Sequence, residues 1–414
     1  LENSINSQVP DVFLFSTYIW THHLPSTFAR EIKRIYPNTL IIGGGPNISK
    51  DLESQKKFLL ENSYIDLFVL YEGETATCNI IEKYLSLNKD IDALKKLDLP
   101  STISLLPNGE FKPSFSSPRI GVKRKNKEVN NKKNPFDFFS DLNDVPSPYL
   151  NGLMDKFFDN KLYPLIETNR GCPFKCSFCQ QGESYFTKVA FKGLQQVKKE
   201  LHYIAKNMTE KSPAISHVEI ADPNFAMYPQ DLEICEEFRK IQDKYMWPKF
   251  IGCSTGKNQP ERILNAVSKV YPDSLLVSNS MQSTNEETLE AIKRSNIKLK
   301  DYSRVQTEIH KRGLRSMADV ILGLPLETKK SHFKAVTNLI DSGVQEFTSY
   351  QAMVLKSTDL ELKDVKQKYG LKTKWRMLPR STGEYQICGN KFIVTEAEEI
   401  IVSTNTLSFK DYLD

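Results

Sequence analysis

Three cysteines stand close together in the stretch TNRGCPFKCSFCQ, which covers residues 168–180. Cys172, Cys176 and Cys179 have C-x3-C-x2-C spacing. The loop begins with Gly-Cys-Pro, which lets the backbone fold back so that three thiolates converge. A structural zinc site takes four ligands, and a redox dithiol takes two. A cubane held by three thiolates keeps one iron free for another ligand. The spacing therefore favours an open iron–sulfur site.

Two other interpretations of this spacing stay open. The cysteines could form a zinc knuckle with a distant fourth ligand, or they could be core residues, because short motifs also occur by chance. Four further cysteines, Cys78, Cys235, Cys253 and Cys388, lie far apart along the chain. Most of them stand in apolar or helical contexts, where cysteine behaves as a small hydrophobic residue. We therefore expect these four to be dispensable for a metal site.

The cysteine stretch resembles the signature of the radical S-adenosylmethionine (SAM) superfamily, C-x3-C-x-aromatic-C, with Phe178 as the aromatic residue. The resemblance implies a [4Fe–4S] cluster on Cys172, Cys176 and Cys179, whose free iron binds the amino and carboxylate groups of SAM. It further implies that one electron, from a donor of the flavodoxin or ferredoxin type, cleaves SAM to methionine and a 5′-deoxyadenosyl radical. Phe178 is then expected beside SAM.

Composition excludes several other classes of protein. The chain has 414 residues, 39% hydrophobic and 10% aromatic, which suffices for the cores of about two domains. A net charge of +5 is small for so many charged residues, so a nucleic-acid partner is not expected. The absence of a long apolar run and of a secretory leader at Leu1 predicts a cytoplasmic protein without a membrane partner.

Apolar runs alternate with helical patterns in the first part of the chain. Strands are expected at 12–18, 39–42 and 67–71, and helices at 25–35, 51–62 and 76–85. A polar helix at 88–99 and a hairpin at 100–118 follow. Such alternation predicts a parallel sheet whose ligand lies beyond the carboxyl ends of the strands. The GGGP run after the second strand would let a ligand approach the backbone, although a plain turn has the same pattern.

The strings FSTYIW, IIGGGP and LYEGE are similar to those of the cobalamin-binding domain that accompanies many radical SAM proteins. The resemblance implies that Ser16, Thr17, Gly43 and Gly44 line the groove for the nucleotide tail of the corrinoid. The cobalt-ligating motif of that domain, D-x-H-x-x-G, does not occur in the chain.

That motif belongs upstream of Val12, so we expect either that the N-terminus has been cut or that this branch lacks it. His22 and His23 lie one element too late to match it, and we interpret them as ordinary surface or loop histidines.

Six strand patterns separated by helical patterns follow the linker. They cover 163–168, 217–221, 249–253, 274–279, 316–322 and 346–351. This alternation predicts a barrel or partial barrel with its chemistry at the carboxyl ends of the strands. The cysteine loop follows the first of them.

Polar residues at the ends of the later strands are candidates for SAM binding. Asp222 and Asn224 lie where the superfamily commonly has a Gly-Gly-Glu that holds the SAM amino group, although Asp-Pro-Asn also forms ordinary turns.

By resemblance, Gln282 and Ser283 are candidates for the ribose and carboxylate of SAM. Arg294 is a candidate for a charge-assisted bond to the carboxylate, unless it is a surface helix charge. Ile321 and Gly323 are expected at the adenine.

We therefore predict an α/β fold with a truncated Rossmann-like, cobalamin-binding-like domain and a radical SAM (β/α)6 partial TIM barrel. The predicted boundaries are 1–120 for the first domain, 121–160 for a linker, 161–360 for the barrel and 361–414 for an incomplete C-terminal extension. The linker carries a basic run without aromatic residues, which is typical of a solvated connector. Native proteolysis is expected to cut first between Val122 and Asn134.

The leading hypothesis is a cobalamin-dependent radical SAM methyltransferase that acts on an unactivated carbon. By resemblance, its cofactors are a [4Fe–4S] cluster, SAM and cobalamin. One alternative is a radical SAM enzyme that performs a rearrangement, a cyclisation or another redox reaction beside a vestigial first domain. Another alternative, from a different class, is a nucleic-acid or protein-binding module with a structural metal.

Overall fold

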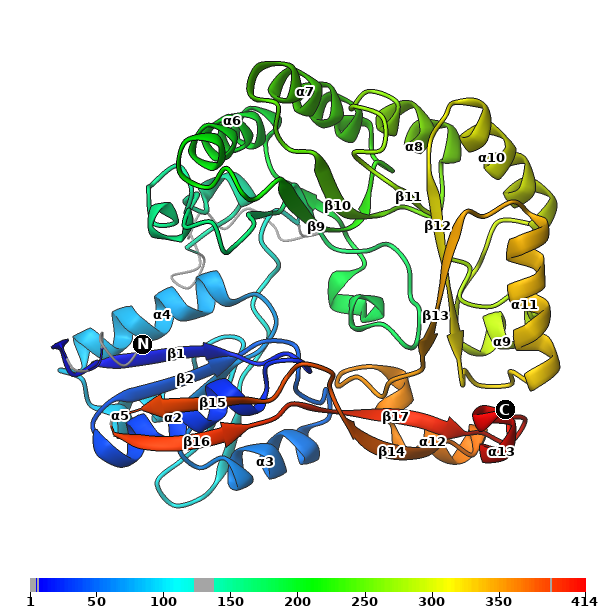
Figure 1. Ribbon diagram of the computed structural model, residues 1–414. Helices are drawn as coiled ribbons and strands as arrows, with labels where there is room; N and C mark the ends of the chain where they lie inside the picture. Colours follow the sequence, from blue (N-terminus) through cyan, green and yellow to red (C-terminus); the bar gives the residue numbers. More distant parts are fainter. Residues whose placement is uncertain (1–4, 6, 123–137, 388) are drawn as a thin grey trace, which may run out of the picture.

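The computed structural model describes residues 5, 7–122, 138–387 and 389–414. The proteolytic site expected within the linker lies almost wholly outside these residues. The described chain forms an N-terminal sheet, an arc of strands above it, and a C-terminal segment that runs back from the arc to the sheet (Figure 1). None of the described helices combines the length and the apolar character that crossing a bilayer requires.

The N-terminal sheet has five strands in the order β1-β2-β3-β4-β5. They are β1 (Val12–Ser16), β2 (Leu40–Gly44), β3 (Leu67–Val69), β4 (Thr102–Leu105) and β5 (Phe111–Pro113). The first three are parallel, as expected, and β4 and β5 are antiparallel. The hairpin expected at 100–118 therefore does not stand apart, because β4 pairs with β3 and extends the sheet.

Both faces of this sheet are covered, which explains its continuous apolar strands. The helices are α2 (His23–Ile35), α3 (Leu52–Glu61), α4 (Gly73–Ser86) and α5 (Ile91–Lys96). Ile41 packs in one core with Ile32 and Leu59 of α2 and α3. Its neighbour Leu40 packs in the other core with Ile80 of α4. The carboxyl ends of β1, β2 and β3 are thus the free edge at which a ligand can approach.

The arc contains the six strands that the sequence predicts. They are β6 (Leu165–Ile166), β9 (His217–Phe225), β10 (Phe250–Thr255), β11 (Val277–Ser278), β12 (Ser316–Leu322) and β13 (Glu346–Gln351). They form two three-stranded sheets, β10-β9-β6 and β11-β12-β13, whose paired strands are all parallel. A hydrogen bond of 2.7 Å from the Ile251 amide to the Ser274 carbonyl connects the two sheets.

Helices cover the outer side of the arc (Figure 1). They are α6 (Leu194–Lys211), α7 (Pro229–Tyr245), α8 (Pro260–Val267), α9 (Glu286–Ala291), α10 (Leu299–Lys311) and α11 (Lys329–Asp341). The cysteine loop follows β6 and lies between the two strands of a short antiparallel pair, β7 (Asn169–Arg170) and β8 (Ala190–Phe191). It therefore lies at the carboxyl end of the first strand of the arc, as expected.

The C-terminal segment connects the arc to the N-terminal sheet. Its elements are α12 (Lys363–Tyr369), β14 (Lys372–Met377), β15 (Gly383–Ile387), β16 (Asn390–Val394), β17 (Ala397–Ser403) and α13 (Phe409–Leu413). The Ile401 amide of β17 donates to Ala352, just after β13, at 2.9 Å. At the other end of the segment, Ile387 is buried in the core beside α2. The extension thus belongs structurally to both parts.

Glu396 makes a further link at the start of α2. This buried carboxylate accepts hydrogen bonds of 2.8–3.0 Å from the backbone amides of His22, His23 and Leu24. The first amides of a helix have no partner within the helix and favour negative charge. Burial, followed by the charge of His23, lowers the pKa of His22. The His22–His23 pair thus marks the start of a capped helix.

Candidate functional site

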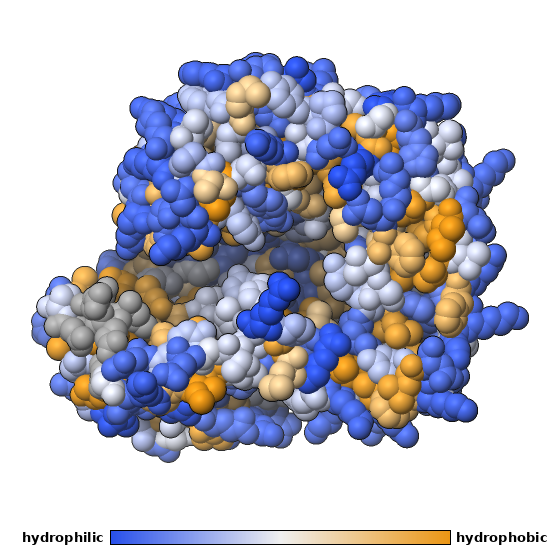
Figure 2. Space-filling view, viewed as in Figure 1, coloured by the Kyte–Doolittle hydropathy of each residue, from blue (hydrophilic) through white to orange (hydrophobic). Residues whose placement is uncertain are grey.

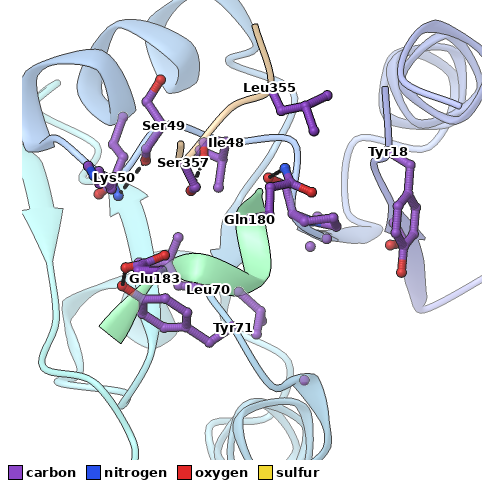
Figure 3. A pocket seen from close by; sticks show the side chains of 18 of the residues that line it. Tyr18, Ile48, Ser49, Lys50, Leu70, Tyr71, Gln180, Glu183, Leu355 and Ser357 are labelled. Carbon is purple, nitrogen blue, oxygen red and sulfur yellow. Dashed lines mark hydrogen bonds between the residues drawn. The ribbon is translucent and has the colours of Figure 1, made fainter. Parts of the chain in front are cut away.

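A cavity of about 810 Å³ lies between the carboxyl edge of the N-terminal sheet and the cysteine loop. The molecule is hollowed between the arc and the N-terminal part in the space-filling view (Figure 2). From the sheet the cavity is lined by Ser16, the turn 43–46 and Tyr71, and from the cysteine loop by Cys179 and Gln180. Figure 3 shows the close-up, in which Gln180, Tyr71 and Glu183 lie on one wall. The two regions that carried the sequence motifs thus face one cavity.

The three glycines of the turn after β2 have different reasons to be glycine. A Cβ at Gly43 would come within 2.7 Å of the Phe68 ring, so this glycine serves core packing. A Cβ at Gly45, where φ is +96°, would come within 2.5 Å of the Thr17 carbonyl. A Cβ at Gly44 would meet nothing closer than 3.7 Å. Gly44 is therefore the position whose missing side chain leaves space in the cavity.

Ser16 and Thr17 also differ in their surroundings. Ser16 lines the cavity. Thr17 is fully buried, and its amide and hydroxyl both donate to the Gly44 carbonyl, at 2.8 and 3.0 Å. Thr17 therefore holds the glycine turn in place, whereas Ser16 is available to a ligand.

The three cysteines of the loop differ in their exposure. Cys172 and Cys176 are buried, and Cys179 reaches the cavity. Burial raises the pKa of the Cys179 thiol to about 11, and the charges of Cys176 and Cys172 act in the same direction. Gly182 lets the loop turn tightly, because a Cβ there would lie 2.2 Å from the Cys176 carbonyl. Within the described ranges, no three His, Cys, Asp or Glu side chains are arranged around a single metal ion.

The chemistry of this donor set suits an iron–sulfur cubane. Three thiols come from one loop, and cysteine thiolates are the usual ligands of [4Fe–4S] clusters. A cubane also takes ligands that stand farther apart than those of one ion, because each thiolate binds a different iron. Three ligands leave the fourth iron for SAM.

Polar side chains surround the sulfurs. The Asn224 amide donates to the Cys172 sulfur at 3.3 Å, and the Arg294 guanidinium lies 3.8 Å from the Cys176 sulfur. Lys257 stands nearby, and its pKa is lowered to about 8 by burial and then by the charge of Arg294. Hydrogen bonds and positive charge near the sulfurs favour the more negative state of a cluster. The sequence analysis did not single out Lys257. Its place just after β10, at the carboxyl end of a barrel strand, could have marked it as a candidate site residue.

Two other residues predicted to bind SAM, Asp222 and Ser283, form hydrogen bonds within the protein instead. Asp222 is buried, and its carboxylate accepts from the Thr168 amide at 2.8 Å and from the Asn169 side chain at 2.8 Å. Burial raises its pKa to about 6. Ser283 is also buried and donates to Glu327 at 2.7 Å. These two side chains thus stabilise strand ends.

The remaining candidates lie at the inner side of β12. Phe178 and Ile321 pack against the same apolar cluster, so the structure brings the cysteine loop and β12 together. The Gln282 backbone pairs with β12, and its side-chain oxygen is buried without a hydrogen-bond partner among the described residues. Gly323 has a φ of +92°, and a Cβ there would lie 3.2 Å from the Ile401 carbonyl. The positive φ and the close approach of β17 explain the glycine at this position without a ligand.

Residues 166–361 match the Radical SAM superfamily. This part of the chain is a radical SAM domain. The match begins in β6, includes the cysteine loop and ends just after β13, so it covers the whole arc.

Two curated relatives are similar over most of this chain. It is 29% identical over 374 residues to the cobalamin-dependent radical SAM methyltransferase TokK of Streptomyces tokunonensis, covering 88% of this chain and 50% of TokK. It is 27% identical to the 2-(S-pantetheinyl)-carbapenam-3-carboxylate methyltransferase of Streptantibioticus cattleyicolor, covering 98% of this chain and 55% of that protein. The chain thus spans about half the length of these relatives.

Solved structures share the fold. The radical SAM methyltransferase TsrM from Kitasatospora setae, with cobalamin and a [4Fe–4S] cluster bound, has a TM-score of 0.63 at 14% identity, covering 91% of this chain and 68% of TsrM. OxsB, with aqua-cobalamin and SAM bound, has a TM-score of 0.56 at 16% identity, covering 88% of this chain and 47% of OxsB. These alignments cover 91% and 88% of this chain, whereas residues 166–361 are less than half of it. Both alignments therefore extend into the N-terminal sheet.

Proposed function

We propose that this radical SAM chain is the core of a cobalamin-dependent methyltransferase that acts on an unactivated carbon. The observation that supports this most strongly is the shared cavity. Cys179 of the cysteine loop and Gly44 of the sheet edge line the same space. Methyl transfer between a corrinoid and a carbon radical formed beside SAM requires such an arrangement, because reacting atoms must come within about 3–3.5 Å.

In this proposal Cys172, Cys176 and Cys179 hold the [4Fe–4S] cluster, and Ser16 and Gly44 border the corrinoid. When bound, the cluster supplies the electron that cleaves SAM and the corrinoid carries the methyl group. The electron comes from a donor of the flavodoxin or ferredoxin type.

The chain's own residues position these groups and exclude water. Asn224 donates to the Cys172 sulfur, and Arg294 and Lys257 place positive charge where SAM would present its carboxylate. Gln282 stays a candidate for the SAM ribose because its amide oxygen has no partner among the described residues. Phe178 and Ile321 offer an apolar surface to the adenine. The cavity wall includes the apolar side chains Leu14, Ile42, Val69, Leu70 and Phe186.

Isotope labelling tests methyl transfer without knowledge of the substrate. The reconstituted chain is incubated anaerobically with hydroxocobalamin, a reductant and SAM that carries a trideuterated methyl group. We expect mass spectrometry to find the label in the corrinoid fraction. An unlabelled corrinoid, together with continued cleavage of SAM, would instead favour the alternative of a different radical reaction beside a scaffold domain. A chain with Cys176→Ala serves as the control for chemistry that does not need the cluster.

A further inference from the structure

Two sets of contacts fasten the cysteine loop and the segment after it to the N-terminal part of the chain. The first is built on Glu72 and Arg119, whose side chains are 7% and 5% exposed and form an ion pair of 3.3 Å. Arg119 also donates to the Arg170 carbonyl at 3.1 Å and to the Lys188 carbonyl, on the two sides of the cysteine loop. Arg170 in turn pairs with Glu74 at 2.8 Å. We call this set the Glu72 anchor.

Aromatic side chains strengthen the Glu72 anchor. The Tyr71 ring stacks on the Tyr185 ring with a centroid distance of 4.0 Å, and the Tyr71 hydroxyl donates to Glu183 at 2.9 Å. The Arg119 guanidinium lies 5.6 Å from the Tyr185 ring centroid. Tyr71 adopts a φ of 64°, which is rare for an aromatic residue and persists only where the surroundings enforce it. The turn after β3 is thus shaped to hold the segment that follows the cysteines.

The second set is built on Gln180, the residue after Cys179. Its side-chain amide donates to the Pro46 carbonyl of the glycine turn at 2.8 Å and to the Lys356 carbonyl beyond β13 at 3.0 Å. One side chain thus joins the cysteine loop, the N-terminal sheet and the end of the arc. Beside it, Ser357 donates to the Ile48 carbonyl at 2.7 Å. We call this set the Gln180 anchor.

We propose that the Glu72 and Gln180 anchors are positioning devices that set the separation between the cluster and the corrinoid. This inference rests on the proposed function. Each anchor joins a turn at the carboxyl edge of the sheet to a residue close to the cysteines, so the two cofactor sites share one rigid frame. A displacement of about 1 Å can cost catalysis 10²-fold, so such a frame has a direct consequence for methyl transfer. Removing one partner of a buried ion pair is also strongly unfavourable, which makes the Glu72 anchor sensitive to substitution.

Pulsed electron paramagnetic resonance tests this positioning. The full chain is reconstituted with the cluster, loaded with hydroxocobalamin and reduced, so that cob(II)alamin and the reduced cluster both carry unpaired spins. Their magnetic coupling reports the distance between them. Glu72→Gln and Gln180→Met are expected to weaken the coupling and to broaden its distribution, while iron and cobalt per chain stay at the wild-type level. Glu72→Asp, which keeps the buried charge and thereby the fold, should give a smaller shift in the same direction.

Matched controls carry the same substitutions on outer helices. Glu308→Gln on α10 changes a half-buried side chain and Gln195→Met on α6 an exposed one, and both should leave the coupling unchanged. A wild-type coupling in all three anchor variants would overturn the positioning role and leave the proposed function intact. A wild-type chain that takes up the cluster but no cobalamin would overturn the proposed function, and the inference with it.

Discussion

Replacement of Cys176 by alanine is expected to abolish the iron–sulfur cluster. Two remaining thiolates cannot hold a cubane that is ligated by three, so iron and sulfide should fall from about four each per chain to near zero. The fold should survive, because the loop is shaped by backbone contacts such as the close approach of Gly182 to the Cys176 carbonyl. The measurement is iron and sulfide analysis after anaerobic reconstitution, together with loss of the brown absorption.

The cysteines outside the loop provide the controls. Cys235 is fully buried in α7 within the apolar core of the arc, where a cysteine behaves as a small hydrophobic residue. Cys78 lies on α4, outside the loop. Cys235→Ala and Cys78→Ala should therefore keep about four irons per chain. Loss of the chromophore in either variant, with retention in Cys176→Ala, would contradict the assignment. Cys388 lies outside the described residues, and its dispensability stays a prediction.

Gly44→Trp is expected to prevent cobalamin binding. The position has open space where a side chain would begin, and an indole buries 150–250 Å² of surface, which would fill the part of the cavity beside the sheet edge. We expect titration of hydroxocobalamin into this variant to give no saturable absorbance change, whereas the wild type saturates. Cluster content should remain unchanged.

Two alanine variants separate blocked binding from a damaged fold. Gly44→Ala adds only a Cβ with ordinary contacts and should bind cobalamin as the wild type does. Gly43→Ala forces a Cβ against the Phe68 ring and should lower the free energy of unfolding by about 1–3 kcal/mol. If Gly44→Trp bound hydroxocobalamin with unchanged affinity, the N-terminal sheet would not be the cobalamin site and would have only a structural role.

Local patterns predicted most of the fold. Continuous apolar runs marked β1 and β2, of which β2 is buried on both faces. The strands β12 and β13 have the residue bounds that alternation predicted. The cysteine loop was found because its three cysteines lie within eight residues, at 172–179. Such signals depend only on neighbours in the sequence.

Contacts between distant residues could not be predicted in this way. Glu72 and Arg119 are 47 positions apart, and Glu396 is 374 positions from His22, so no periodicity connects either pair. The sequence also placed Asp222 at a strand end without giving its direction, and its carboxylate points to Thr168. The LYEGE string was noted for its resemblance to the cobalamin-binding domain. The structure shows in addition that its Tyr71 and Glu72 contact the segment that carries the cysteines.

Release of 5′-deoxyadenosine from SAM tests the central claim most directly. The chain is reconstituted anaerobically with iron and sulfide, then incubated with SAM and a strong reductant, and the products are separated by liquid chromatography. We predict that 5′-deoxyadenosine and methionine accumulate in equal amounts, and that neither forms with Cys176→Ala. A brown, fully reconstituted wild-type chain that leaves SAM intact, or a chain that takes up one zinc and no iron, would contradict the account.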